Sequence, residues 1–119
     1  MTTIYPAEGH VSIWVGTFTE DDDFDEAAEH EVEARLKLPV PLASVAEVAF
    51  EEDSISTRTL LEGFSGWETF VEEASRVAEV KNVSTANSAL VCYHVKCDNA
   101  PASFGALTFL GTFSVAGLK

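Results

Sequence analysis

The chain has few basic residues. Seven lysines and arginines stand against twenty aspartates and glutamates among 119 residues, which gives a formal net charge of −13 and a pI near 4.3. Such a surface repels the phosphates of nucleic acids, and it attracts a basic protein and speeds their encounter. Solubility is the alternative explanation of the same charge. The composition therefore argues against nucleic acid as a partner and leaves a basic protein partner open.

Long apolar runs are also missing. No stretch approaches the roughly 20 apolar residues that a membrane-spanning helix needs. The first nine residues contain neither the basic region nor the apolar region of a secretion signal. We therefore expect no membrane association and a cytoplasmic protein.

Cysteine is scarce, with only Cys92 and Cys97. On one strand, a spacing of five residues points the two side chains to opposite faces, which argues against a disulfide between them. We expect two ordinary thiols, buried or half-buried.

The clearest strand signal is the run Val-Ser-Ile-Trp-Val-Gly-Thr-Phe over residues 11–18. It is rich in β-branched and aromatic residues and apolar on both faces, which is typical of a central strand. Gly16 suggests a bulge or a close approach of another backbone. Residues 107–113 repeat the Gly-Thr-Phe pattern, so we expect the first and last strands to be neighbours in one sheet.

Two segments have helical periodicity. Residues 20–37 begin with four acids, which suit a helix N-terminus, and an apolar side chain recurs every four residues from Phe24. Residues 66–80 follow a capping box made by Ser65 and Glu68. The apolar stripe of this second helix predicts burial of Trp67, Phe70, Val71 and Ala74.

The remaining segments are shorter. Residues 1–10, with Pro6 and Gly9, are expected to form a loose lead-in. Residues 45–50 suggest a short strand or a loop with strand character, ended by the charged residues 51–53, and residues 57–63 suggest one helical turn. A polar turn over residues 82–87 precedes a strand over 89–96, which is expected to form a hairpin with the last strand over 106–115.

The order of elements is thus β-α-β-α-α-β-β. It predicts a single α+β domain over residues 1–119, with a mostly antiparallel sheet of about four strands and two main helices packed on one face.

No pattern of residues predicts catalysis or a bound cofactor. His10, His30 and His94 lack the spacing of metal ligands. The acids near Asp21 do not match a calcium-binding loop, which requires glycine at its sixth position and glutamate at its twelfth. Cys92 and His94 form only a nominal pair, with nothing to activate the thiol. We therefore expect no metal, no cofactor and no enzymatic activity.

Three segments, taken in order, resemble the immunity protein 22 family. They are residues 11–26, the run Leu-Leu-Glu-Gly-Phe-Ser at 60–65 that leads to Phe70, and the two final strands at 87–93 and 107–113. The chain departs from the family at residues 38–49 and at Ala27 and Ala28. The resemblance implies a small cytoplasmic antitoxin of a bacterial polymorphic toxin system, which binds a cognate toxin domain and blocks it.

Nine acids lie between Glu20 and Glu33 with no lysine or arginine among them. Only those in the first turn are explained by the helix dipole, so the others suggest a surface that steers a basic toxin, for example a nuclease. The predicted toxin-binding residues are Glu20, Asp21, Asp22, Asp23, Asp25, Glu26, Glu29, Glu33, Glu51, Glu52 and Asp53. The alternatives are a general acidic interaction module or nucleic-acid mimic, and a small hydrolase that uses surface carboxylates.

Overall fold

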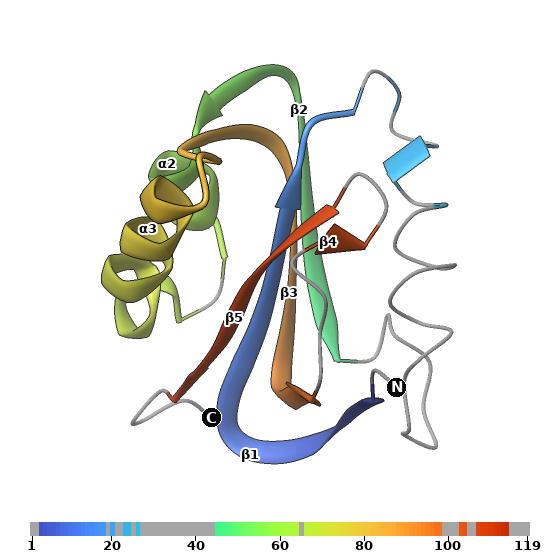
Figure 1. Ribbon diagram of the computed structural model, residues 1–119, viewed down its shortest axis with the longest axis vertical. Coiled ribbons are helices and arrows are strands. Elements are labelled where there is room, and N and C mark those ends of the chain that lie inside the picture. Colours follow the sequence, from blue (N-terminus) through green and yellow to red (C-terminus); the bar gives the residue numbers. More distant parts are fainter. Residues whose placement is uncertain are drawn as a thin grey trace.

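The computed structural model describes residues 3–18, 20, 23, 24, 26, 45–64, 66–98, 103, 104 and 107–114. Within these residues the chain forms an antiparallel five-stranded sheet in the order β2-β3-β1-β5-β4 (Figure 1). The strands are β1 (Thr3–Gly16), β2 (Ala46–Ser56), β3 (Thr85–Asp98), β4 (Ser103–Phe104) and β5 (Leu107–Ser114). The helices are α2 (Thr57–Leu61), the 3-10 helix η4 (Trp67–Thr69) and α3 (Val71–Val80). The predicted α+β class is confirmed.

The first and last long strands are neighbours, as the repeated Gly-Thr-Phe pattern predicted. β1 pairs with β5 through Ile13 and Gly111, and with β3 on its other side. A strand between two others, in a sheet covered on both faces, must be apolar on both faces. β1 meets this requirement: Ile13 and Val15 point to one face, Trp14 points to the other, and all three are fully buried.

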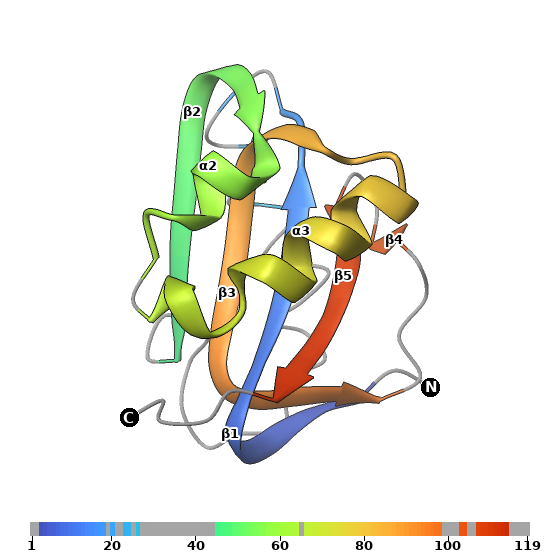
Figure 2. The ribbon, with the colours of Figure 1, turned by 90° about the vertical axis from the view of Figure 1, so that its left-hand side faces the viewer.

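Two apolar cores lie on opposite faces of the sheet. The helix-side core contains Ile13, Leu61, Phe70 and Ala74, so α2 and α3 cover this face (Figure 2). The second core contains Trp14, Leu90, Leu107, Phe109 and Phe24. Phe24 belongs to the first predicted helix, so the described part of that segment packs on the face away from α3, and the sheet is covered from both sides.

The segment predicted as one helix over residues 66–80 is two helices. Phe70 has φ −130° and separates η4 from α3, and Gly66 precedes η4 without any side-chain cap hydrogen bond. Ser65 of the predicted capping box lies outside the described residues. Burial of Phe70, Val71 and Ala74 is confirmed, but Trp67 is only half-buried, because it lies in the short η4 turn before the break.

Two strands are longer than the sequence predicted. The loose lead-in is wrong for residues 3–10, which belong to β1. Pairing of β1 with β3 is interrupted between Pro6 and Val11, and Gly9 has φ 79° within this interruption. Pro6 and Gly9, which suggested an irregular segment, therefore lie at a bulge inside the strand. Likewise the acids at 51–53 do not end β2. They lie in a bulge between Phe50 and Ile55, where pairing with β3 shifts.

The prediction that the last two long strands form a hairpin is also wrong, because β1 lies between β3 and β5. Local sequence favours pairing of consecutive strands, whereas a strand that is apolar on both faces is typical of the middle of a sheet, with a neighbour at each edge. The predicted helical turn is confirmed as α2, with Leu60 and Leu61 buried. Among the described residues no helix is both long and apolar enough to cross a membrane.

The two cysteines lie on the same face of the sheet, so the prediction of opposite faces is wrong. Cys92 and Cys97 both belong to the second core. His94, which lies between them, has φ 57° at the point where pairing with β1 shifts, and this changes the alternation of side chains along β3.

Both thiols are free, as expected. Burial, with a smaller contribution from Cys97, raises the pKa of the Cys92 thiol to about 12.

Candidate functional site

The described members of the predicted toxin-binding set are all exposed. They are Glu20, Asp23 and Glu26 after β1, and Glu51, Glu52 and Asp53 in the bulge of β2. The other members lie outside the described residues: Asp21, Asp22, Asp25, Glu29 and Glu33.

Three aromatic rings connect the two groups of acids. The ring centroids of Phe18 and Phe24 are 5.5 Å apart, and those of Phe24 and Phe50 are 6.3 Å apart with nearly parallel planes. Phe24 is 1% exposed, so it fixes its segment against the second core. Its amide donates to the carbonyl of Glu20, at 3.4 Å, which is the pattern of a helical turn. Since Phe50 immediately precedes Glu51, the turn that carries Phe24 and the start of the β2 bulge lie on either side of this stack.

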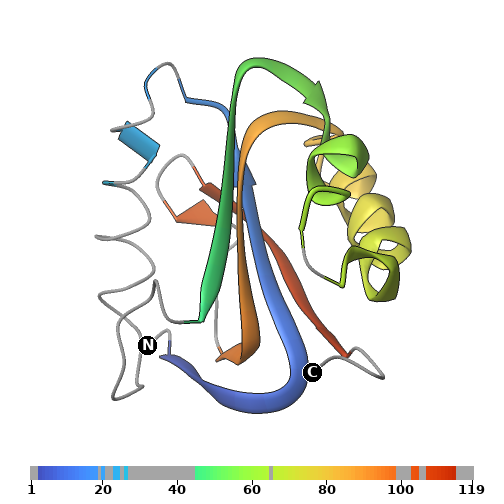
Figure 3. The same cartoon turned by 180° about the vertical axis from the view of Figure 1, so that it is seen from behind.

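We call these six exposed residues the acidic end: Glu20, Asp23, Glu26, Glu51, Glu52 and Asp53. The sheet register brings the two segments together, since Ser88 of β3 is the partner both of Gly16 in β1 and of Phe50 in β2. The end of β1 and the bend of β2 lie at the same end of the molecule (Figure 3). The sequence predicted these acids as a set, and the register places the two segments that carry them at the same end of the sheet.

Asn87 holds the chain where it leaves the sheet toward the acidic end. Its side-chain oxygen accepts from the amide of Phe18 at 2.9 Å, and its side-chain nitrogen donates to the carbonyl of Phe18 at 2.6 Å. The Ser88 hydroxyl donates to the same oxygen of Asn87. The buried carboxamide thus takes the place of a backbone partner and continues the pairing of β1 with β3 beyond Gly16. The sequence suggested a polar turn over residues 82–87, but the strand begins at Thr85.

Basic groups do not neutralise the acidic end within the described residues. The Arg58 guanidinium is occupied elsewhere, at 2.7 Å from Glu72 and 3.6 Å from Glu62. The hydrogen bond and the charge of Arg58 lower the pKa of Glu72, and the same contacts raise that of Arg58. Both groups are at the surface, so these shifts indicate an ordinary ion pair. As far as the described part of the chain shows, the acidic end therefore has no ion pair to offset its negative charge.

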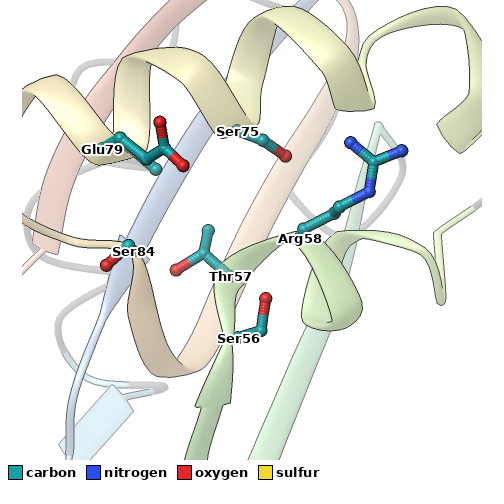
Figure 4. Close-up of a pocket in the computed structure, with 7 residues that line it drawn as sticks. Ser56, Thr57, Arg58, Ser75, Glu79 and Ser84 are labelled. Carbon is teal, nitrogen blue, oxygen red and sulfur yellow. The ribbon is translucent and has the colours of Figure 1, made fainter.

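A cavity of about 200 Å³ lies between α3 and the junction of β2 with α2 (Figure 4). Its lining consists of Ser56, Thr57, Arg58, Ser75, Ala78, Glu79 and Ser84. Thr57 donates its hydroxyl proton to the carbonyl of Val83, and the buried Ser75 hydroxyl oxygen has no hydrogen-bond partner in the described part of the chain. A serine nucleophile requires a base within hydrogen-bond reach, and neither Glu79 nor any other described side chain bonds Ser75. The described residues of the cavity therefore supply polar groups, and among them no base is bonded to Ser75.

The described histidines and cysteines form no cluster that could hold a metal. The His94 ring accepts a hydrogen bond from the amide of Gly9 at 3.1 Å, and the His10 ring lies 3.1 Å from the carbonyl of Glu8. His30 lies outside the described residues. Because its pKa is raised to about 12, the Cys92 thiol stays protonated at neutral pH and is a poor nucleophile. The Cys92–His94 pair thus gains no support as a catalytic pair.

Comparisons with protein families, with characterised proteins and with solved structures found no match for this chain.

Proposed function

We propose that this protein is an immunity protein of the kind that its sequence resembles. It binds a cognate toxin domain in the cytoplasm and neutralises it by occlusion, without catalysis and without a cofactor. The observation that carries the proposal is the acidic end, where six exposed acids from two distant segments flank the contact of Phe24 with Phe50, and no basic residue in the described part of the chain is paired to them. Such a surface complements a basic toxin and accelerates its association.

Packing accounts for the position of the backbone there, but not for the acids themselves. Phe24 and Phe50 fix the two segments, whereas the acidic side chains point to solvent and repel one another. Self-repulsion lowers stability, so such a concentration of acids is better explained by a basic partner than by the fold.

The test pairs the protein with the toxin domain encoded beside its own gene. Co-expression should restore growth that the toxin domain alone abolishes. Asp23→Lys, Glu26→Lys and Glu51→Lys together should slow association about tenfold or more at low salt and reduce its salt dependence.

The matched control carries Glu68→Lys, Glu73→Lys and Glu79→Lys. It makes the same change in net charge at exposed positions of η4 and α3, and it should associate at a rate much closer to wild type. If wild type gives no protection, the immunity proposal fails. Equal slowing by both triple variants would mean that only net charge matters, as in a general acidic module.

A further inference from the structure

β2 is an edge strand of the sheet. One side pairs with β3, and no other described strand pairs with its outer side. An edge strand presents unpaired amides and carbonyls that another chain can bind. Residues 46–50 pair with β3 in continuous register, so this part of the edge has regular strand geometry up to the bulge at 51–54.

The hydrogen-bond pattern identifies the outward backbone groups. The amide of Tyr93 donates to the carbonyl of Val45 at 2.8 Å. Antiparallel partners alternate between pairs that exchange hydrogen bonds and pairs whose backbone groups point away. With the observed register, Glu47 and Ala49 bond to β3, so the amides and carbonyls of Ala46, Val48 and Phe50 point outward. In the described part of the chain, three outward donors and three outward acceptors thus lie along this edge.

The side chains of this edge combine an apolar contact with negative charge. Val48 is 58% exposed, between Ala46 and Phe50, which pack against the second core. Four acids and no lysine or arginine occur in β2: Glu47, Glu51, Glu52 and Asp53. Pairing of two copies of this edge would bring like charges together, which is destabilising. The charge instead complements a strand that carries cations.

We propose that the outer edge of β2 at residues 46–50 accepts an extended strand of the toxin that carries lysine or arginine at alternate positions. This inference rests on the proposed function and specifies how the partner binds. The backbone of the added strand pairs with Ala46, Val48 and Phe50, and its apolar side chains cover Val48. Its cations reach the acids that follow Phe50, and the bulge limits the paired segment to about five residues.

Val48→Pro tests the edge with little disturbance of the fold. Proline removes the outward amide of Val48 and leaves every hydrogen bond to β3, and edge strands tolerate proline with the N–H side facing solvent. Val48→Pro should weaken binding of the toxin domain at least tenfold, whereas Val48→Thr, which keeps the amide, should stay within about threefold of wild type. Ala49→Pro checks the register, because it removes an inward amide and should destabilise the fold.

A second measurement separates this inference from the immunity proposal. A synthetic peptide of alternating lysine and valine is added to the protein, and amide chemical shifts are followed by NMR. The peptide should shift the amides of Ala46, Val48 and Phe50, and an N-methylated version, which cannot pair as a strand, should not.

If Val48→Pro binds the toxin domain or the peptide as wild type does, the inference is overturned while the immunity proposal stands. Sedimentation that shows a dimer abolished by Val48→Pro would also overturn it, since the occupant would be a second copy of this chain. If wild type fails to protect against the toxin, the immunity proposal falls and the peptide result alone decides whether the edge binds a basic strand.

Discussion

Asn87 shows how one polar side chain can take the place of a strand. Both ends of its carboxamide bond the backbone of Phe18, and the residue is 3% exposed. Asn87→Ala would leave the amide and carbonyl of Phe18 without these partners, and an unsatisfied buried polar group costs about 1–3 kcal/mol. We expect urea denaturation to show that the free energy of unfolding falls by about 2–4 kcal/mol. Two groups lose their partners, and each regains part of its hydration.

Ser114→Ala, at an exposed position of β5, is the control and should change stability by less than about 0.5 kcal/mol. A loss of similar size in both variants would show that the Asn87 side chain does not hold the end of β1.

Cys92 makes stability depend on pH in the alkaline range. Its pKa is raised in the folded state to about 12, from an ordinary value near 9. A raised pKa contributes stability that is fully present below the unfolded value and is lost as the pH rises toward the folded value. We expect the free energy of unfolding to fall by about 2–3 kcal/mol between pH 9 and pH 11, measured by urea denaturation.

Cys92→Ala removes this titration, although it lowers stability at every pH by creating a cavity. Its unfolding free energy should therefore fall less steeply above pH 9. Parallel curves for the variant and the wild type would show that other groups cause the alkaline loss.

At the scale of elements, the break between η4 and α3 changes the expected contribution of each aromatic residue. Phe70 is 2% exposed in the helix-side core, whereas Trp67 packs at its margin and is half-buried. From the helical pattern alone, Trp67→Ala would be expected to cost about 3–5 kcal/mol, the range for a buried aromatic residue. The structure assigns that range to Phe70→Ala and about 1–3 kcal/mol to Trp67→Ala, because part of the indole surface stays in water.

Chemical denaturation of both variants checks this order. Glu68→Ala, in the same turn but exposed, should change stability by less than about 0.5 kcal/mol. A larger loss for Trp67→Ala than for Phe70→Ala would mean that the helix is continuous and that Trp67 is its buried anchor.

The bulge in β5 determines which of its side chains face each of the two cores. Gly111 has φ 141° where the pairing of β5 with β1 shifts, and a Cβ atom there would lie 3.4 Å from the Phe113 ring. Leu107 and Phe109 therefore face the second core, while Leu110 and Phe113 face the helix-side core. The sequence placed a possible bulge at Gly16 in β1, but this one lies at the matching glycine of β5.

At the scale of the whole molecule, the net charge of −13 opposes compaction. Salt screens this repulsion, so raising NaCl from 20 to 200 mM should stabilise the protein by about 1 kcal/mol and raise Tm by about 4 °C, measured by thermal unfolding. Replacing Asp23, Glu26 and Glu51 by lysine reduces the formal charge to −7, because each exchange adds two positive charges. That triple variant should show a smaller salt effect, and an unchanged salt effect would show that repulsion at the acidic end does not limit stability.

The sequence alone determined the fold class, the central position of residues 11–16 and the pairing of the first and last strands. It also determined the buried stripe of Phe70, Val71 and Ala74. These features follow from local periodicity and from apolar faces that must be covered, which a chain displays residue by residue. The same local signal identified the acids of the predicted toxin-binding surface, including those outside the described residues.

Only the tertiary structure decided the order of strands, the sharing of one face by Cys92 and Cys97, and the contact of Phe24 with Phe50 beside the bulge of β2. Each depends on register and bulges, which pairing with distant strands sets, as at His94 and Gly111. The role of Asn87 and the outward backbone of β2 likewise require a partner strand to define them. A hydrogen bond between segments 69 residues apart leaves no periodic signal in either of them.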